Sequence, residues 1–187
     1  MLRVTWEWIG IDAAAFDVAN TVAISGGVAH DLLEPEGEYE RWADAAAASP
    51  ALDRAEAAAL EEGRSRVLEL REQIRAVLCA TAAGEPSPEA AVAALNAASR
   101  SSPQWPELSV DGEVRARSDA SPLDRLLATY ARSAIEIAAD GRAQLRICGA
   151  PSCGMFYRPR RRQQRWCSEP CGTRARFARH YRAHRSR

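Results

Sequence analysis

Four of the five cysteines of this 187-residue chain lie within 24 residues, in the spacing Cys148-x4-Cys153-x13-Cys167-x3-Cys171. We expect a cytoplasmic protein with no secretory leader, and in that compartment such a tight cluster favours a metal site over disulfides. Four thiolates bind Zn²⁺ in a closed tetrahedron that has no open position for chemistry. A segment of about 40 residues with few large aliphatic side chains is too small to fold on apolar burial alone, and zinc binding supplies on the order of 10 kcal/mol. The spacing therefore predicts a structural zinc site.

Two other arrangements of these residues stay open. The cysteines could be unpaired thiols or two disulfides, because the x4 and x13 spacings are looser than those of the commonest zinc sites. A second alternative replaces the first two cysteines with His180 and His184. Its gap of eight residues is shorter than the roughly 12 residues usual in such fingers. We expect these histidines to be packing or surface residues, on a helix face that they share with Phe177 and Tyr181 and that packs inward.

The net charge changes sign just before the segment that holds the four clustered cysteines. Residues 1–145 hold 24 acidic residues and 13 arginines, a net charge of −11, whereas residues 146–187 hold 12 arginines and one acidic residue, a net charge of +11. Dense arginine with interleaved aromatic residues is typical of nucleic-acid binding, since arginine contacts phosphate bidentately and stacks on bases. The candidate contacts are Arg158, Arg160, Arg161, Arg162, Arg165, Arg174, Arg176 and Arg179. A basic segment that docks on the acidic part of its own chain is the alternative.

The upstream residues are rich in alanine and show apolar residues at helical spacing, so we predict a mainly α protein with minor β. The expected helices are residues 12–24, 53–83 with a break at Gly63, 88–98 and 122–140; the expected strands lie in 1–11 and in a hairpin over 108–115. This gives a helical domain over residues 1–143. A small basic zinc-finger module follows over 144–187 and ends in a helix that Ser168 caps.

Several residue stretches resemble a known family. Residues 165–174, Arg-Trp-Cys-Ser-Glu-Pro-Cys-Gly-Thr-Arg, after Cys153-Gly-Met-Phe156, resemble the CGNR-type zinc finger. Proteins with this finger usually carry an N-terminal ABATE domain, and residues 16–21, 68–75, 95–96 and 122–135 are similar to that domain. The chain departs from the usual pattern at Thr173, where the signature has Asn, and in the loop Tyr157-Arg158-Pro159, which is more basic than usual. The resemblance implies a stress-linked bacterial transcription regulator whose N-terminal domain senses or binds something.

Three polar residues on a largely apolar helix, Asp17, Asn20 and Thr21, have two interpretations. They line a ligand pocket between helices, or they bridge backbone groups inside the core. We expect Arg71 and Arg75 on a helix surface, with at most one buried ion pair. We also expect Cys79 in the core, and Trp42 and Trp105 in the core or at a domain contact.

These patterns together predict a transcription regulator that binds DNA through an arginine-rich module ordered by Zn²⁺. An RNA-binding protein and a protein-interaction module with an acidic partner are the alternatives. The chain has three histidines, no paired-carboxylate motif and no phosphate-binding loop, so we do not expect an enzyme. We expect no membrane association; a small-molecule effector of the N-terminal domain and a homodimer are compatible with the sequence.

Overall fold

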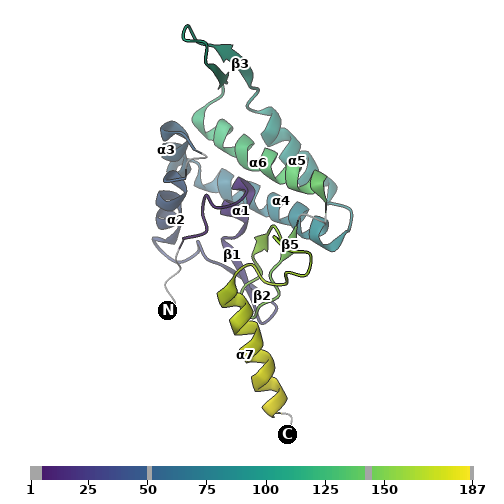
Figure 1. Cartoon of the computed structure of the whole chain (residues 1–187). Coiled ribbons are helices and arrows are strands. Elements are labelled where there is room, and N and C mark those ends of the chain that lie inside the picture. Colours follow the sequence, from purple (N-terminus) through teal and green to yellow (C-terminus); the bar gives the residue numbers. More distant parts are fainter. Residues whose placement is uncertain (1–5, 50–51, 142–144, 186–187) are drawn as a thin grey trace.

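The computed structural model describes residues 6–49, 52–141 and 145–185, and it is mainly helical with three small antiparallel hairpins (Figure 1). The helices are α1 (Ala14–Ala19), α2 (Glu38–Ala47), α3 (Arg54–Glu62), α4 (Arg64–Ala83), α5 (Glu89–Arg100), α6 (Pro122–Asp140) and α7 (Glu169–Arg185). The strands are β1 (Val22–Ser25), β2 (Val28–Asp31), β3 (Trp105–Leu108), β4 (Val114–Arg117), β5 (Arg146–Ile147) and β6 (Phe156–Tyr157). No described helix combines the length and the apolar character needed to cross a lipid bilayer.

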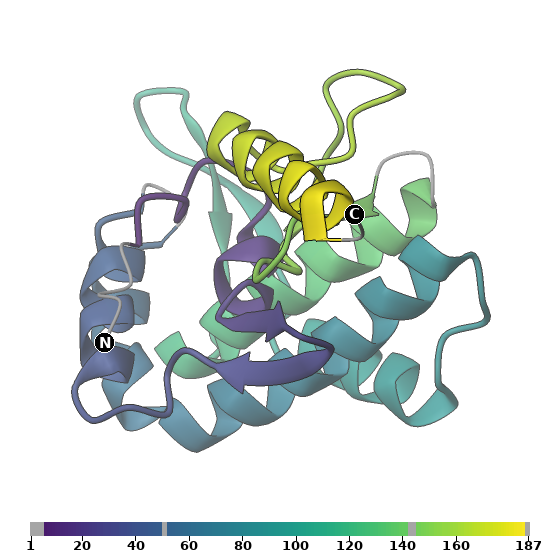
Figure 2. The same ribbon diagram turned by 90° about the horizontal axis from the view of Figure 1, so that it is seen from below.

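The helical body is built on α4, α5 and α6, which pack against one another, with α1 against α4 and α6. The apolar positions predicted by helical spacing are buried: Ile74 and Leu78 on α4 and Ile137 on α6 are fully enclosed. Trp42 joins this core, and its indole N–H donates to the carbonyl of Asp17 at 2.9 Å. The hairpin β1–β2 and helix α7 lie on the same side of this helical layer, as the two views agree (Figure 2).

The predicted break at Gly63 is confirmed, because α3 ends there and α4 begins with the next residue. A Cβ at this position would lie 2.2 Å from Leu123 Cδ1 on α6 and 2.9 Å from the carbonyl oxygen of Ala59, so glycine lets Leu123 pack closely against this turn. Helix α3 starts at a capping box, in which Asp53 and Glu56 exchange side-chain and backbone hydrogen bonds. Helix α6 starts where predicted, with Ser121 accepting the amide of Asp124.

The C-terminal module is not a separate body, because β6 sends a side chain into the main core. Phe156 is 2 % exposed and belongs to the same hydrophobic cluster as α1, α4 and α6. Asn20, at the end of α1, binds both backbone groups of Phe156: its Nδ2 donates to the carbonyl at 3.1 Å and its Oδ1 accepts the amide at 2.7 Å. In β1, the amide of Ile24 donates to the carbonyl of Cys153 at 2.9 Å. The module and the body therefore share one buried interface.

Close approach at this interface requires a glycine. Gly154 has φ of +77°, and a Cβ there would lie 2.5 Å from Ile24 Cγ1. A side chain would both strain the left-handed backbone and separate the module from β1. The hydroxyls of Ser25 and Ser152 lie 2.8 Å apart beside it and extend the contact.

Two expectations about the first 31 residues are wrong. Residues 6–11 form turns instead of a strand, while residues 1–5 lie outside the described residues. The helix predicted over 12–24 stops at Ala19 and is followed by the hairpin β1–β2. Gly26 and Gly27 both have positive φ and form the turn of this hairpin.

Three smaller differences lie further along the chain. Pro88 is the N-cap of α5 instead of its first helical residue. The β3–β4 hairpin is longer than 108–115, and its Trp105 is 41 % exposed. Cys79 is exposed on α4, where it faces away from the core.

Candidate functional site

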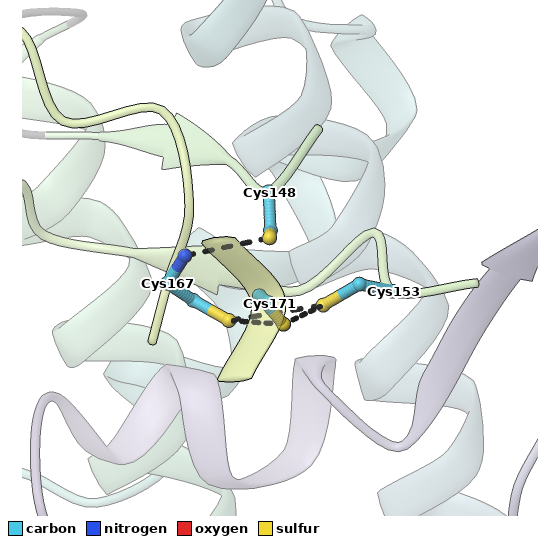
Figure 3. A group of neighbouring side chains, drawn as sticks. All are labelled: Cys148, Cys153, Cys167 and Cys171. Atoms are coloured by element: carbon cyan, nitrogen blue, oxygen red, sulfur yellow. Dashed lines mark hydrogen bonds between the residues drawn. The ribbon is translucent and has the colours of Figure 1, made fainter. Parts of the chain in front are cut away.

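The four cysteines that the spacing selected converge in space (Figure 3). Cys148 follows β5, Cys153 lies in the turn before β6, Cys167 precedes α7, and Cys171 lies in its first turn. Three of the thiol separations are 3.7 Å from Cys153 to Cys167, 3.5 Å from Cys167 to Cys171 and 3.7 Å from Cys171 to Cys153. All four sulfurs lie within 4.8 Å of one another.

These separations fit a zinc ion held by four thiolates. With Zn–S bonds of about 2.3 Å, the edge of a tetrahedron of sulfurs is about 3.8 Å. A disulfide needs two sulfurs at about 2.0 Å, and all five cysteines are free thiols. His180 and His184 lie elsewhere, on the exposed part of α7, so the arrangement that used them in place of Cys148 and Cys153 is wrong.

The surroundings favour the ionised form of Cys148, whereas the neighbouring sulfurs and burial raise the pKa values of Cys153 and Cys167. The amide of Cys167 donates to Cys148 Sγ at 3.4 Å, and Arg174 Nη2 donates to Cys171 Sγ at 3.1 Å. The pKa of Cys148 is lowered, chiefly by hydrogen bonds from the thiols of Cys153 and Cys167. Several thiolates this close repel one another unless a cation offsets their charge, which Zn²⁺ does.

The three residues after Cys171 (Gly172, Thr173 and Arg174) each make a specific contact in the first turns of α7. Gly172 is buried against Trp166, whose ring would lie 3.3 Å from a Cβ at that position. Thr173 accepts a hydrogen bond from Arg176 Nη2 at 2.8 Å, and Arg174 contacts the ligand sulfur. Ser168 caps the helix as predicted, since its Oγ accepts the amide of Cys171 at 3.4 Å. Ser168 and Arg174 thus contact the ligand Cys171 directly, and Gly172 leaves room for Trp166 beside it.

Comparison with known families assigns both parts of the chain. Residues 12–141 match the model of the ABATE family, described as "Putative stress-induced transcription regulator". The chain belongs to the ABATE family. Residues 144–185 match the CGNR zinc finger. No curated protein matches the chain. The ABATE description and the finger support a regulatory or nucleic-acid-binding role, and the four cysteines are the zinc site of the finger.

Each of the eight arginines singled out in the finger is exposed. They come from two segments, the loop that connects β6 to Cys167 and helix α7. Arg174 and Arg176 also have roles within the module, through the contacts to Cys171 and Thr173. Within the described ranges, Arg158 is the member of this set that pairs with a carboxylate of the ABATE domain, Asp12, at 3.9 Å.

The expected inward aromatic face of α7 is wrong. Phe177 is 71 % exposed and Tyr181 is 65 % exposed, whereas Cys171 and Ala175 face the zinc core. The reason is the length of α7: only its first turns rest on the finger, and the remainder projects away from the rest of the molecule (Figure 1). A shallow groove of about 960 Å³ runs along this exposed face, between Pro170 and Tyr181.

The polar residues of α1 and the following turn make hydrogen bonds inside the protein. Asp17 accepts the amide of Gly10 at 3.0 Å, Asn20 holds Phe156, and Thr21 donates to the carbonyl of Val18 at 2.7 Å. These contacts correspond to the second interpretation, in which the three residues bridge backbone groups. Asn20 also lies at the edge of a cleft of about 1220 Å³ between the ABATE domain and the finger.

Of the two arginines of α4 that were expected on the surface, Arg71 is buried and Arg75 is half-buried. Arg71 is 5 % exposed and forms a bidentate pair with Asp31, at 2.8 and 2.6 Å, and a bond to Thr21 Oγ1 at 3.2 Å. Arg75 donates to the carbonyls of Ala19 and Val22. Together they attach β1 and β2 to α4. The sequence offers one sign that these arginines are not fully exposed: they lie one helical turn apart, each directly after a buried apolar residue of α4.

Proposed function

We propose that this protein is a transcription regulator that binds double-stranded DNA through the basic surface of its zinc finger. The observation that carries the proposal is that all eight arginines are exposed. Arg158 is the one of these eight that pairs with a carboxylate of the acidic N-terminal part, within the described residues. A basic segment that served to dock on its own domain would bury more of its charge in ion pairs. Exposed guanidinium groups gathered on one loop and one projecting helix are the electrostatic footprint of a polyanion site.

The form of α7 supports a duplex as the target. A helix with its side chains is about 10–12 Å wide and the major groove of B-DNA is about 12 Å wide, so a projecting helix can enter it. The zinc site fixes the first turn of α7, and the basic loop lies beside it. Arg176 and Arg179 lie on the flank of the exposed helix face, where they reach phosphates on the groove wall.

RNA or single-stranded DNA is the second candidate, favoured by the exposed aromatic side chains. Phe177 and Tyr181 lie on the same projecting helix as the arginines. Unpaired bases stack on such rings, at about 1–3 kcal/mol per base. Docking on an acidic protein is the remaining alternative, and it predicts no binding to either nucleic acid.

We also propose that the protein is not an enzyme. The support is that Cys148, Cys153, Cys167 and Cys171 provide all four ligands of a tetrahedral zinc, which leaves no coordination position for a substrate or water. A cytoplasmic location, an effector of the ABATE domain and a homodimer are further parts of the proposal, based on the sequence.

The test is the fluorescence anisotropy of labelled 20-nucleotide duplex DNA, single-stranded DNA and RNA of one sequence, titrated with zinc-loaded protein between 50 and 200 mM salt. With five or six phosphates contacted, the slope of log K against log salt is about −5. The double variant R176A/R179A lowers the magnitude of that slope by about 2. Arg174 is left intact because it contacts a metal-ligand sulfur.

The matched control is R115A/R117A, which removes two exposed arginines from the hairpin β3–β4 at the opposite end of the molecule (Figure 1). We expect the control to bind as the wild type does. Stronger binding to single strands than to duplex selects the second candidate. Absence of salt-dependent binding to all three probes refutes the proposed function.

A further inference from the structure

The exposed part of α7 carries two histidines that the zinc site does not use. His180 and His184 are one helical turn apart, and their Nε2 atoms lie 3.1 Å from each other. The ring centroids are 4.3 Å apart and both side chains are exposed. Residues four apart on a helix face the same direction, so this proximity follows from the helix itself.

The separation of the two nitrogens is the one that a single metal ion requires. Imidazole binds zinc and similar ions at about 2.0–2.1 Å. Two such nitrogens are about 2.9 Å apart at an angle of 90° and about 3.3 Å apart at the tetrahedral angle, from the same bond length. The observed 3.1 Å, at which the two rings are also within hydrogen-bond distance, lies between these limits, so the nitrogens have the separation that one ion bound to both would set.

This pair is separate from the four-cysteine site. His180 follows Cys171 by nine residues on α7, which is about 13 Å along the helix axis. The cysteines also complete a tetrahedral coordination among themselves. An ion at the histidines therefore cannot share ligands with the structural zinc.

We propose that His180 and His184 form a second, surface site for a borderline divalent transition-metal ion such as Ni²⁺, Cu²⁺ or Zn²⁺. Two protein nitrogens leave the other coordination positions to water, so this ion exchanges readily, in contrast to the enclosed zinc of the cysteines. Affinity follows the general order for nitrogen ligands, with Cu²⁺ above Ni²⁺ and Zn²⁺. The chelate spans one turn and stabilises the helical conformation of the projecting end of α7.

A bound dication also adds positive charge to the helix that carries Arg176 and Arg179. This consequence rests on the proposed function: nucleic-acid affinity would rise with the concentration of the free ion. The metal site itself does not depend on that function, and it is tested without nucleic acid.

The experiment is a calorimetric titration of untagged, zinc-loaded protein with NiCl₂, followed by elemental analysis. We expect one Ni²⁺ per chain with the zinc content unchanged. Either H180A or H184A weakens Ni²⁺ binding by about 10²-fold, because removing one ring turns a chelate into a single contact. The control H30A removes the third histidine, which is exposed on β2, and leaves binding unchanged.

A second variant tests whether the spacing of the two histidines matters when their number is kept the same. R179H/H180A keeps three histidines but moves one to a position five residues from His184, where the rings point in different directions around the helix. We expect it to bind Ni²⁺ as weakly as H180A does. The proposal is overturned if the wild type takes up no Ni²⁺, if Ni²⁺ enters with loss of an equal amount of zinc, or if H184A or R179H/H180A binds Ni²⁺ as the wild type does.

Discussion

Replacing Asn20 with alanine removes both hydrogen bonds by which α1 holds the finger. In the hairpin β5–β6 the ladder bonds join Cys148 to Met155, so the backbone groups of Phe156 point away from the hairpin and towards α1. The side-chain amide of Asn20, itself 5 % exposed, satisfies both and acts in place of a third strand.

The expected cost follows from what the substitution leaves behind. N20A leaves one buried amide and one buried carbonyl of Phe156 without a partner, and each such group costs about 1–3 kcal/mol. We therefore expect the free energy of unfolding to fall by about 2–6 kcal/mol, a large part of the roughly 5–15 kcal/mol typical of a domain. Both groups are buried at the joint interface, so the loss affects the finger and the ABATE domain together.

Urea denaturation of the zinc-loaded protein, followed by tryptophan fluorescence and far-ultraviolet circular dichroism, measures this change. The matched control is N96A, which makes the same substitution at an exposed position of α5 and is expected to change stability by less than about 0.5 kcal/mol. An N20A protein that unfolds within 0.5 kcal/mol of the wild type would refute the idea that this amide joins the two parts.

Three further outcomes follow from the structure. C171S is expected to lose stoichiometric zinc and the helical signal of α7, while C79S, which changes the exposed thiol of α4, keeps both; elemental analysis and circular dichroism check this. G154A places a Cβ 2.5 Å from a β1 side chain and is expected to lower stability in thermal denaturation by about 2 kcal/mol more than G26A, which has positive φ but open space around it. Burial raises the pKa of Asp17 to about 6, so the folded protein binds the proton more tightly than the unfolded chain does, and stability falls as pH rises from about 4 to 6. D17N is expected to remove this loss, by about 3 kcal/mol in denaturation curves at pH 7.

The zinc site could be predicted from the sequence because its chemistry is local. Four thiols in a short segment have few ways to be satisfied, and the spacing of Cys148, Cys153, Cys167 and Cys171 placed the ligands before any fold was known. Helices α4 and α6 were predictable for a similar reason, since their apolar residues recur over many turns.

The contacts between the parts could not be predicted in this way. The hairpin β1–β2 is short and mixes buried and exposed residues, so its pattern does not differ from that of a helix end. The sequence predicts Arg71 to be a surface residue, because its partner Asp31 lies 40 residues away and is brought opposite it only by the fold. The prediction that the aromatic face of α7 is buried was wrong, because helical periodicity shows which residues share a face but not which face packs against the protein.

The insertion of Phe156 into the core of the ABATE domain limits how this finger can be reused in evolution. Most small zinc modules are exchangeable units, since the metal supplies their folding energy. Here a transplanted finger would expose an aromatic ring and two unsatisfied backbone groups unless the recipient domain offered a matching pocket and an amide in place of Asn20. The two parts are therefore expected to be inherited together, and substitutions on one side of the joint to be compensated on the other.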